Sequence, residues 1–271
     1  MSLDNKPAIF ELYSPHVPII GVLSIPHSGE ILPEEFKEYL INDPVLIARD
    51  VDYGVHHLVD IEKLNQNGIA VIKSNIIRTA IDLNRSRDKC FLNWEKNSHG
   101  EKIVLKRPDK NTEEKLIQTY YAPYYEVMTA MINELKYKMK IASFIDLHSM
   151  PSTPTEYHYQ QNPNQKAHRP DFCLSDDFGD TCESSFIETV KHLLEKHYSQ
   201  VKINDPYIGG HITKYITTIP EVNNIQIEIK RDIYMDESKR ELIRDLSEPL
   251  KPILTDCLIQ TFTKFWEKYK N

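Results

Sequence analysis

Two histidines in this sequence each follow a short apolar run, and histidines in such positions can bind a catalytic metal ion. His27 comes after Val17 to Ile25, and His148 comes after Ile141 to Leu147. A histidine at the end of a strand, with a carboxylate nearby to orient its second nitrogen, suits a metal ligand. Each histidine alone is equally consistent with a buried structural residue. Their shared position after a strand favours a metal site between them.

Two carboxylates compete for the place of third ligand. Glu30 follows His27 at HxxE spacing, so a tight turn brings both side chains to one ion. Asp52, next to Val51 and Asp50 on an expected helix, can instead point toward the strand ends. Zinc accepts mixed nitrogen and oxygen ligands, and a catalytic zinc site leaves one position for water. The residues themselves leave Glu30 and Asp52 as alternatives.

A general base is expected on a later strand. Ile225 to Ile229 reads IQIEI, which places Gln226 and Glu228 on one face of an otherwise apolar strand. A carboxylate in the interior is strongly unfavourable unless it is paired or functional. We therefore predict that Glu228 deprotonates water at the metal site. The alternative is an amphipathic edge strand whose polar face meets solvent.

Other residues are candidates for binding the substrate. Asn84 and Arg85 close the apolar segment Ile76 to Leu83, and the planar fork of arginine grips carboxylates. We therefore expect a small substrate that bears a carboxylate. Gly210, in a turn with paired glycines, permits close approach of the backbone to a ligand, and His211 follows it directly. A simple hairpin loop is the alternative for this turn.

The elements that must position these residues alternate between strands and helices. Such alternation predicts an α/β fold with a largely parallel sheet covered by helices, and a ligand site beyond the carboxyl ends of the strands. A helix begins at Asp43-Pro44, and a long amphipathic stretch is interrupted at Pro123. The expected strands are 17–25, 69–72, 76–83, 141–147, 201–203 and 225–229, and the expected helical regions are 43–67, 112–140, 181–199 and 236–270, the last broken near Pro249 and Pro252.

Composition narrows the class of protein. The chain has 271 residues and a net charge of -7, so nucleic acid is an unexpected partner. Its four cysteines lack CxxC spacing, which indicates reduced thiols in the cytoplasm. No secretory signal precedes Pro18, and no apolar run is long enough to span a membrane. Ser28 and Ser149 lack the GxSxG context of an esterase nucleophile.

Together, several segments in order resemble one family, the N-formylglutamate amidohydrolases (N-formylglutamate deformylases) of histidine degradation. The resemblance covers residues 20 to about 236 and leaves 236–270 as a helical region of the same single domain, 1–271. The matching segments are Pro26-His27-Ser28-Gly29, Asp50-Val51-Asp52, Arg78 with Asp82-Leu83-Asn84-Arg85, Asp146-Leu147-His148-Ser149, Arg169-Pro170-Asp171-Phe172, Pro206-Tyr207-Ile208-Gly209-Gly210, Gln226-Ile227-Glu228-Ile229 and Tyr234-Met235.

The resemblance implies a fold, a cofactor and roles for residues. The fold is the phosphorylase/hydrolase-like three-layer αβα sandwich, with a mixed and largely parallel sheet, shared with zinc carboxypeptidases and aspartoacylases. One Zn²⁺ is implied, with His27 and His148 as ligands and Glu30 or Asp52 as the third. Sequences of the formylglutamate type often lack the glutamate of HxxE. By the same resemblance Glu228 is the base, and Asn84 with Arg85 binds the substrate carboxylate. With Arg169 from a matching segment, and with Gly210 and His211 from the glycine turn, these complete the expected substrate-binding residues.

The reaction expected from the residues and the resemblance together is zinc-dependent hydrolysis of an N-acyl amide on an acidic amino acid such as N-formylglutamate. Tyr53-Gly54 stands where the family often has an aromatic residue followed by histidine, and the loop Met150 to His168 contains several aromatic residues. These departures weaken the expected substrate more than the expected class of reaction. The alternatives are another N-acyl amino acid, a short peptide, or a non-catalytic relative that binds anions.

Overall fold

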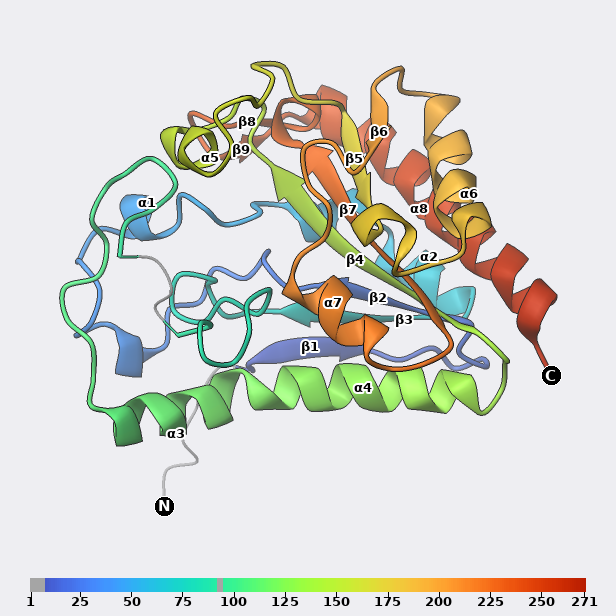
Figure 1. The fold of residues 1–271 in the computed structure, drawn as a ribbon, viewed down its shortest axis with the longest axis horizontal. Coiled ribbons are helices and arrows are strands. Elements are labelled where there is room, and N and C mark those ends of the chain that lie inside the picture. Colours follow the sequence, from blue (N-terminus) through green and yellow to red (C-terminus); the bar gives the residue numbers. More distant parts are fainter. Residues whose placement is uncertain (1–7, 92–94) are drawn as a thin grey trace.

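Seven strands form one mixed sheet at the centre of the protein (Figure 1), in the order β1-β3-β2-β4-β7-β5-β6. The computed structural model describes residues 8–91 and 95–271, so the start of the amino-terminal stretch considered above lies outside it. β3, β2, β4 and β7 run parallel to one another, whereas β1 is antiparallel to β3 and β5 is antiparallel to β7. The strands of this sheet are β1 (Phe10–Tyr13), β2 (Gly21–Ile25), β3 (Ile69–Ser74), β4 (Ala142–Met150), β5 (Phe172–Ser175), β6 (Val201–Ile203) and β7 (Val222–Lys230).

Helices cover both faces of the sheet, and a small pair of strands, β8 (Met235–Asp236) and β9 (Glu241–Leu242), lies apart from it. The α-helices are α1 (Pro44–Ile47), α2 (Ile61–Gln66), α3 (Lys110–Tyr120), α4 (Ala122–Lys136), α5 (Glu156–Gln161), α6 (Ser184–Glu195), α7 (His211–Thr217) and α8 (Arg244–Tyr269). The 3₁₀ turns are η1 (Glu34–Phe36), η2 (Val55–Leu58), η3 (Asp177–Gly179) and η4 (Arg231–Ile233).

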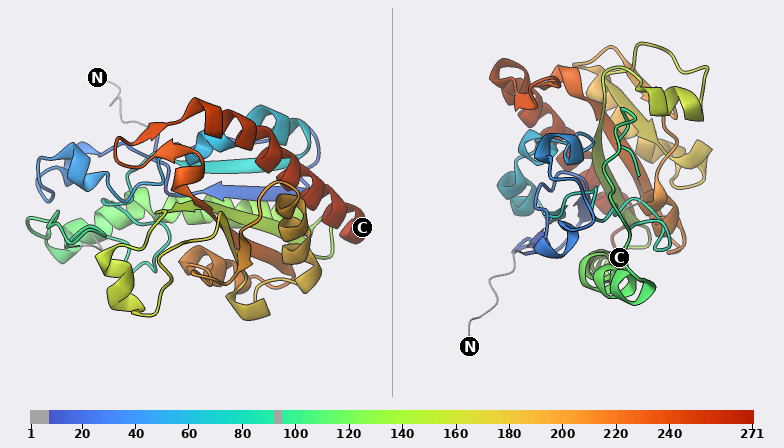
Figure 2. Two further views of the ribbon diagram at one scale, coloured as in Figure 1. Left: turned by 90° about the horizontal axis from the view of Figure 1, so that it is seen from above. Right: turned by 90° about the vertical axis from the view of Figure 1, so that its left-hand side faces the viewer.

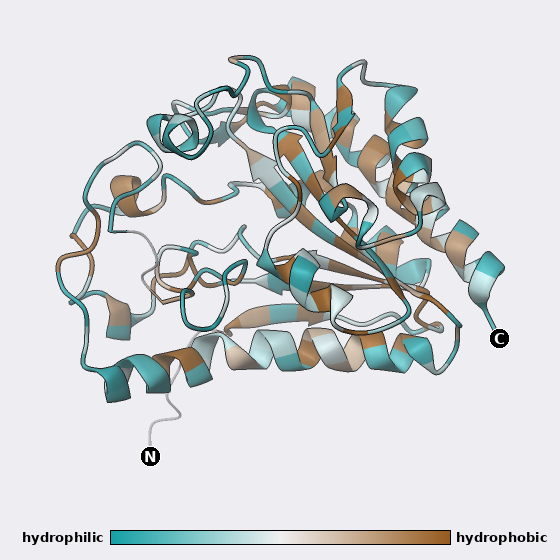
Figure 3. Cartoon of the chain, in the orientation of Figure 1, coloured by the Kyte–Doolittle hydropathy of each residue, from teal (hydrophilic) through white to brown (hydrophobic). Residues whose placement is uncertain are grey.

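Each face of the sheet has its own apolar core, because successive side chains of a strand point to opposite faces. Val22 and Phe144 belong to the core that α3, α4 and α7 complete. Leu23 and Ile145 belong to the other core, which α2, α6 and α8 complete. Figures 1 and 2 show α4 and α8 on opposite sides of the strands, and the strands are the most hydrophobic part of the molecule in Figure 3. The predicted three-layer αβα sandwich with a mixed, largely parallel sheet is confirmed.

The face that carries α4 changes from apolar to polar toward the carboxyl ends of the strands. Along β4 this face presents Phe144, then Asp146, then His148. Asp146 pairs in register with Gln226 of β7, and His148 pairs with Glu228. All four polar side chains are buried. A buried polar patch at the carboxyl ends of parallel strands is where ligands bind in open α/β sheets.

The predicted continuous helix over 43–67 is wrong, because α-helix is found only near its two ends, in α1 and α2. Asp43 does cap α1 through bonds from two backbone N–H groups, but α1 ends at Ile47. The backbone N–H of Asp52 donates to the carbonyl of His27 at 3.0 Å, and Gly54 has a φ of 72°. These features keep the segment irregular up to α2, so Asp52 lies on a loop beside His27 and not on a helix.

The predicted strand over 76–83 is also wrong. β3 already has β1 on one edge and β2 on the other, so residues 76–83 cannot pair with β3 as a further strand of the sheet. Instead it turns back on itself through bonds such as Ala80 N–H to the carbonyl of Ile77. Isolated bridges join Ile76 to Ile31 and Ile81 to Phe91. The apolar run is buried by packing against the α4 side of the sheet, which the periodicity could not distinguish from a strand.

Differences elsewhere are smaller. The break near Pro123 is confirmed, since α3 and α4 meet at Tyr121. The break expected in the last helix is wrong, because α8 is continuous although it contains Pro249 and Pro252. Its buried face, with Leu254, Leu258 and Phe262 among others, packs against the sheet and offsets the lost backbone bonds. No helix in the described ranges is long and apolar enough to cross a lipid bilayer.

Candidate metal centre and substrate cavity

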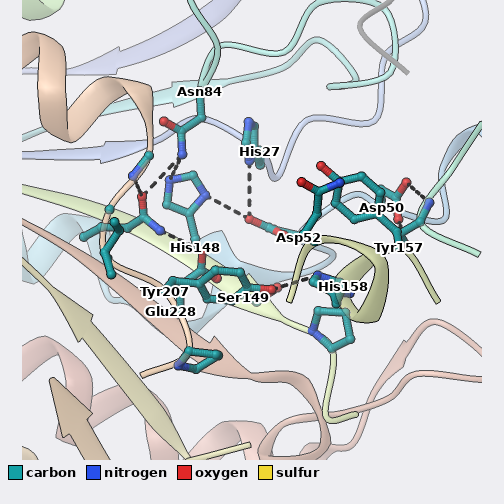
Figure 4. A pocket seen from close by; sticks show the side chains of 18 of the residues that line it. His27, Asp50, Asp52, Asn84, His148, Ser149, Tyr157, His158, Tyr207 and Glu228 are labelled. Atoms are coloured by element: carbon teal, nitrogen blue, oxygen red, sulfur yellow. Dashed lines mark hydrogen bonds and ion pairs between the residues drawn. The ribbon is translucent and has the colours of Figure 1, made fainter. Parts of the chain in front are cut away.

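A cavity of about 390 Å³ lies over the polar ends of β4 and β7 (Figure 4). Its outer wall is formed by segments that connect the strands, including α5 and the turn that precedes α7. A ligand of small-molecule size fits a cavity of this volume. Of the residues predicted from sequence, those that line it are His27, Asp52, Asn84, Arg85, His148, Gly210 and Glu228.

Three buried side chains meet at one point of the cavity and could hold a metal ion. The potential ligand atoms of His27, Asp52 and His148 all lie within 4.8 Å of one another. Asp52 Oδ2 is 3.8 Å from Nδ1 of His27 and 3.2 Å from Nδ1 of His148. Figure 4 shows the three side chains directed toward one another. Two imidazole nitrogens and one carboxylate oxygen form a ligand set that suits a catalytic zinc site with an open position.

A second carboxylate stands behind each histidine. Nε2 of His27 is 2.8 Å from Oδ1 of Asp82, and Nε2 of His148 is 2.7 Å from Oδ2 of Asp146. A carboxylate accepts the proton of Nε2, so Nδ1 is the nitrogen of each ring that faces the centre of the cluster and can coordinate an ion there. Metal-binding histidines are oriented in the same way in many enzymes.

The electrostatics of the cluster also fit a cation. Nδ1 of His27 is buried and has no hydrogen-bond partner among the described residues. Burial and the nearby charge of Arg78 lower the pKa of His27 to about 4, so this ring is neutral and able to coordinate. Burial alone lowers the pKa of His148, but the negative charges of Asp146 and Asp52 outweigh it and hold that pKa well above its usual value. The cluster therefore attracts positive charge.

Asp52 and Glu30 have different surroundings. Asp52 is buried, and its Oδ1 accepts from the guanidinium of Arg231 at 3.1 Å, which leaves Oδ2 to face the histidines. The side chain of Glu30 is about half exposed and lies 3.6 Å from Arg240, outside the cluster. Glu30 follows Gly29, whose backbone packs against the chain at Asn75, and that turn directs Glu30 away from His27. The structure brings Asp52, and not Glu30, to the two histidines.

Glu228 lies beside the cluster on β7, in register with His148. Its Oε1 accepts from the side-chain amide of Gln226 at 2.8 Å, whereas Oε2 is buried with no partner among the described residues. Burial raises the pKa of Glu228 to about 7, although the positive charge of a protonated His148 opposes this rise. A carboxylate with a free oxygen at the edge of a cavity is equipped to accept a proton from water.

Asn84 is fixed from several directions. Its Oδ1 accepts from the backbone N–H of Ile212 at 2.8 Å, and its own backbone N–H donates to Asp82 at 2.9 Å. Its amide nitrogen faces Nε2 of His148 and Oε1 of Gln226. Asn84 therefore connects the start of α7 to the histidine cluster as well as lining the cavity.

Gly210 is needed where it stands because the backbone passes against Asn84. A Cβ atom at position 210 would overlap the amide group of Asn84. The N–H of Gly210 also donates to Oε1 of Gln226 at 2.8 Å, so the turn cannot retreat without breaking this bond.

We expect Gly210→Ala to destabilise the protein by about 1–3 kcal/mol, as overpacking of a tight interior does. Urea unfolding of the metal-free protein measures this change. Asn84→Ala removes the atoms that the new methyl group would meet. Asn84→Ala should therefore destabilise the Gly210→Ala variant by less than it destabilises the wild type. Additive effects of the two mutations would contradict the overlap with Asn84 as the cause of the destabilisation.

The remaining predicted substrate-binding residues lie in three different settings. Arg85 lines the cavity half-buried, with Nη1 donating to the carbonyl of Asn84 at 2.9 Å. Arg169 is buried behind the cavity wall and donates to the hydroxyl of Tyr207 at 2.8 Å. His211 lies outside the cavity, near the rings of Tyr125 and Tyr215 on the α4 side. The structure thus does not bring His211 to the site.

Several residues of the site carried no role in the sequence-based prediction. Asp82 belonged to a quoted segment, but only the fold shows that it supports His27 from behind. Arg231 directly follows β7, and Arg78 lies four residues before Asp82. The sequence signal that could have identified these two arginines was their position close to the predicted strand ends. Tyr207 and His158 line the cavity from two loops, and nothing in their spacing connected them.

Comparison with known proteins places the chain in a family. The family model described as N-formylglutamate amidohydrolase matches residues 20–235. Among solved structures, the N-formylglutamate amidohydrolase of Ralstonia eutropha JMP134 is similar, with 26% identity, a TM-score of 0.82, and coverage of 95% of this chain and 98% of that one. A gene product of Agrobacterium tumefaciens shares the fold, with 15% identity, a TM-score of 0.70, and coverage of 94% and 96%.

A search of curated proteins found no match. The match to the family model covers most of the chain, including every residue of the cluster and Glu228. The family is that of an amidohydrolase, so this chain is an enzyme that acts on an amide bond. This chain belongs to the N-formylglutamate amidohydrolase family.

Proposed function

We propose that this protein is a zinc-dependent amidohydrolase that removes the acyl group, formyl in the first instance, from an acidic amino acid such as glutamate. The observation that carries the proposal is the cluster of His27, Asp52 and His148 next to Glu228 in a small cavity. Family membership supports the reaction, and the structure of the relative from Ralstonia eutropha supports formylglutamate as the first substrate to test.

The residues of the cavity divide the reaction between them. His27, Asp52 and His148 would hold a zinc ion, which would supply Lewis acidity to polarise a carbonyl group and lower the pKa of water to about 7. Glu228 accepts a proton from the attacking water at its unpartnered Oε2 and passes it to the leaving amine. Asp82 and Asp146 keep the two imidazoles in the orientation and tautomer that the site needs.

One arginine of the cavity wall, Arg85, favours an acidic substrate. Arg78 and Arg231 hold Asp82 and Asp52 in ion pairs of 2.9 and 3.1 Å. Arg85 lines the same cavity and is half-buried. We therefore propose that Arg85 binds a carboxylate of the substrate and so orients the amide, since guanidinium and carboxylate groups bond in pairs.

We expect Arg85→Ala to raise KM about 10- to 100-fold with a smaller change in kcat, because a charge-assisted bond of roughly 1.5–3 kcal/mol is lost. Steady-state kinetics of the variant and the wild type with formylglutamate measure this effect. Arg87→Ala is the matched control, since Arg87 is exposed and pairs with Glu114 away from the cavity. Equal kinetics for the two variants would contradict the role of Arg85.

Two measurements test the proposal as a whole. Formyl, acetyl and peptidyl derivatives of glutamate, assayed side by side, should show the highest kcat/KM for the formyl compound. Preference for another acyl group would change the proposed substrate but not the proposed class of reaction. Elemental analysis of untreated protein should find about one zinc per chain, and metal-free protein without activity would favour a non-catalytic anion-binding relative.

A further inference from the structure

The hydroxyl of Tyr207 lies between two hydrogen-bond donors at the wall of the cavity. Nη1 of Arg169 donates to this hydroxyl at 2.8 Å. Nε2 of His158, on α5, lies 2.9 Å from the same oxygen, and Figure 4 labels both side chains. The direction of the hydrogen bond between Tyr207 and His158 depends on which nitrogen of the imidazole carries the proton.

The surroundings of His158 decide that question. The backbone N–H of Thr155 donates to Nδ1 of His158 at 3.1 Å, so Nδ1 must be an unprotonated acceptor. Burial, together with the charge of Arg169, lowers the pKa of His158 to about 4, and the ring is neutral near pH 7. A neutral imidazole has one N–H group, which here is on Nε2. His158 therefore donates to Tyr207.

The oxygen of Tyr207 thus accepts two hydrogen bonds, from Arg169 and from His158. A phenol oxygen with both lone pairs engaged still carries its own hydrogen. Burial raises the pKa of Tyr207, so this hydrogen is retained throughout the working range. In the ranges that the structure describes, no protein group accepts it, and the cavity that Tyr207 lines is the remaining direction.

Tyr207 is anchored next to the reacting end of the cavity. His148, Glu228 and Cys173 form one register row across β4, β7 and β5, and the side chains of such a row share one face. The carbonyl oxygen of Tyr207 accepts from Sγ of Cys173 at 3.3 Å and from Oγ of Ser175 at 2.8 Å. The backbone of Tyr207 is thereby fixed at the end of the row that carries the proposed base.

We propose that Tyr207 is a catalytic hydrogen-bond donor to the acyl oxygen of the substrate, and that His158 and Arg169 are positioning residues that direct its hydrogen into the cavity. The proposal rests on the proposed function. The acyl oxygen gains negative charge as water adds to the carbonyl carbon, and a donor fixed in advance stabilises this charge more than it stabilises the ground state.

Tyr207→Phe is expected to lower kcat by about 10²- to 10³-fold, as loss of one such donor does, with KM changed by less than about threefold. Zinc content should match the wild type, since the hydroxyl contacts no proposed ligand, whereas the unfolding temperature should fall because Arg169 and His158 lose their shared acceptor. A raised KM with unchanged kcat would show that the hydroxyl binds a remote group of the substrate and would overturn the catalytic role.

A matched pair at position 158 tests the positioning role. His158→Gln keeps an N–H donor for Tyr207 and should retain most of the activity. His158→Glu offers only an acceptor, so the hydrogen of Tyr207 turns toward it and kcat should fall as far as in Tyr207→Phe. Adding Tyr207→Phe to His158→Glu should then cause no further loss. Equal losses in the Gln and Glu variants would overturn the role of His158.

A readout independent of turnover separates this inference from the proposed function. Nitrogen-15 NMR of the imidazole rings should show His158 as the neutral tautomer protonated at Nε2, without titration above about pH 5. Protonation at Nδ1 in an active enzyme would overturn the role of Tyr207 alone. A wild-type protein that hydrolyses none of the amides would overturn the proposed function and the role of Tyr207 together, whatever the tautomer.

Discussion

Asp52→Asn is expected to abolish stoichiometric metal binding and with it turnover, whereas Glu30→Gln is expected to preserve both. Oδ2 of Asp52 faces the Nδ1 atoms of His27 and His148, while Glu30 is directed toward Arg240. Removing the negative charge of a direct ligand should weaken binding by more than the roughly 10- to 100-fold typical of outer partners. Zinc per chain after dialysis, together with kcat, measures the effect in both variants.

Asparagine is the informative replacement because it should fold. Its oxygen can keep the bond to Arg231, and its NH₂ group can donate to Nδ1 of His148 once that ring is neutral. Alanine would instead leave the guanidinium buried without its carboxylate, at several kcal/mol. Unfolding of the metal-free proteins should therefore show a smaller loss of stability for Asp52→Asn than for Asp52→Ala. Loss of zinc in Glu30→Gln, with zinc retained in Asp52→Asn, would reverse the assignment of the third ligand.

Glu228→Gln is expected to lower kcat by about 10²- to 10⁴-fold while the metal content stays at the wild-type level. The two side chains have nearly the same shape, and the oxygen of glutamine can still accept from Gln226. What is lost is the basic oxygen, Oε2, which has no partner among the described residues. Single-turnover kinetics with elemental analysis on the same sample separate loss of the base from loss of zinc.

The Glu30→Gln variant serves here as well, as a carboxylate-to-amide change outside the cluster. It should keep the kinetics of the wild type. Normal turnover in Glu228→Gln would exclude this residue as the base. Loss of zinc in Glu228→Gln would show instead that this carboxylate is a metal ligand, and it would overturn the assignment of Glu228 as the base.

Secondary structure was predictable where local rules act alone. The strands that contain His148 and Glu228 were located because buried β-branched runs in a sheet have few alternatives. The segment before Asp52 was misassigned as helix because its apolar spacing fits a helix as well as an irregular buried segment. The backbone bond from Asp52 to His27 and the left-handed Gly54 prevent the helix, and the former joins residues 25 positions apart.

By itself, the sequence determined the class of fold and the family, and it predicted the two histidines and the proposed base, since each depends on residue types at fixed local spacing. Only the tertiary structure decided between Glu30 and Asp52, because the direction of a side chain on a loop is set by packing against distant segments. Packing against distant segments also places His211 outside the cavity. It brings Tyr207 next to His158, although the two lie 49 residues apart in the chain.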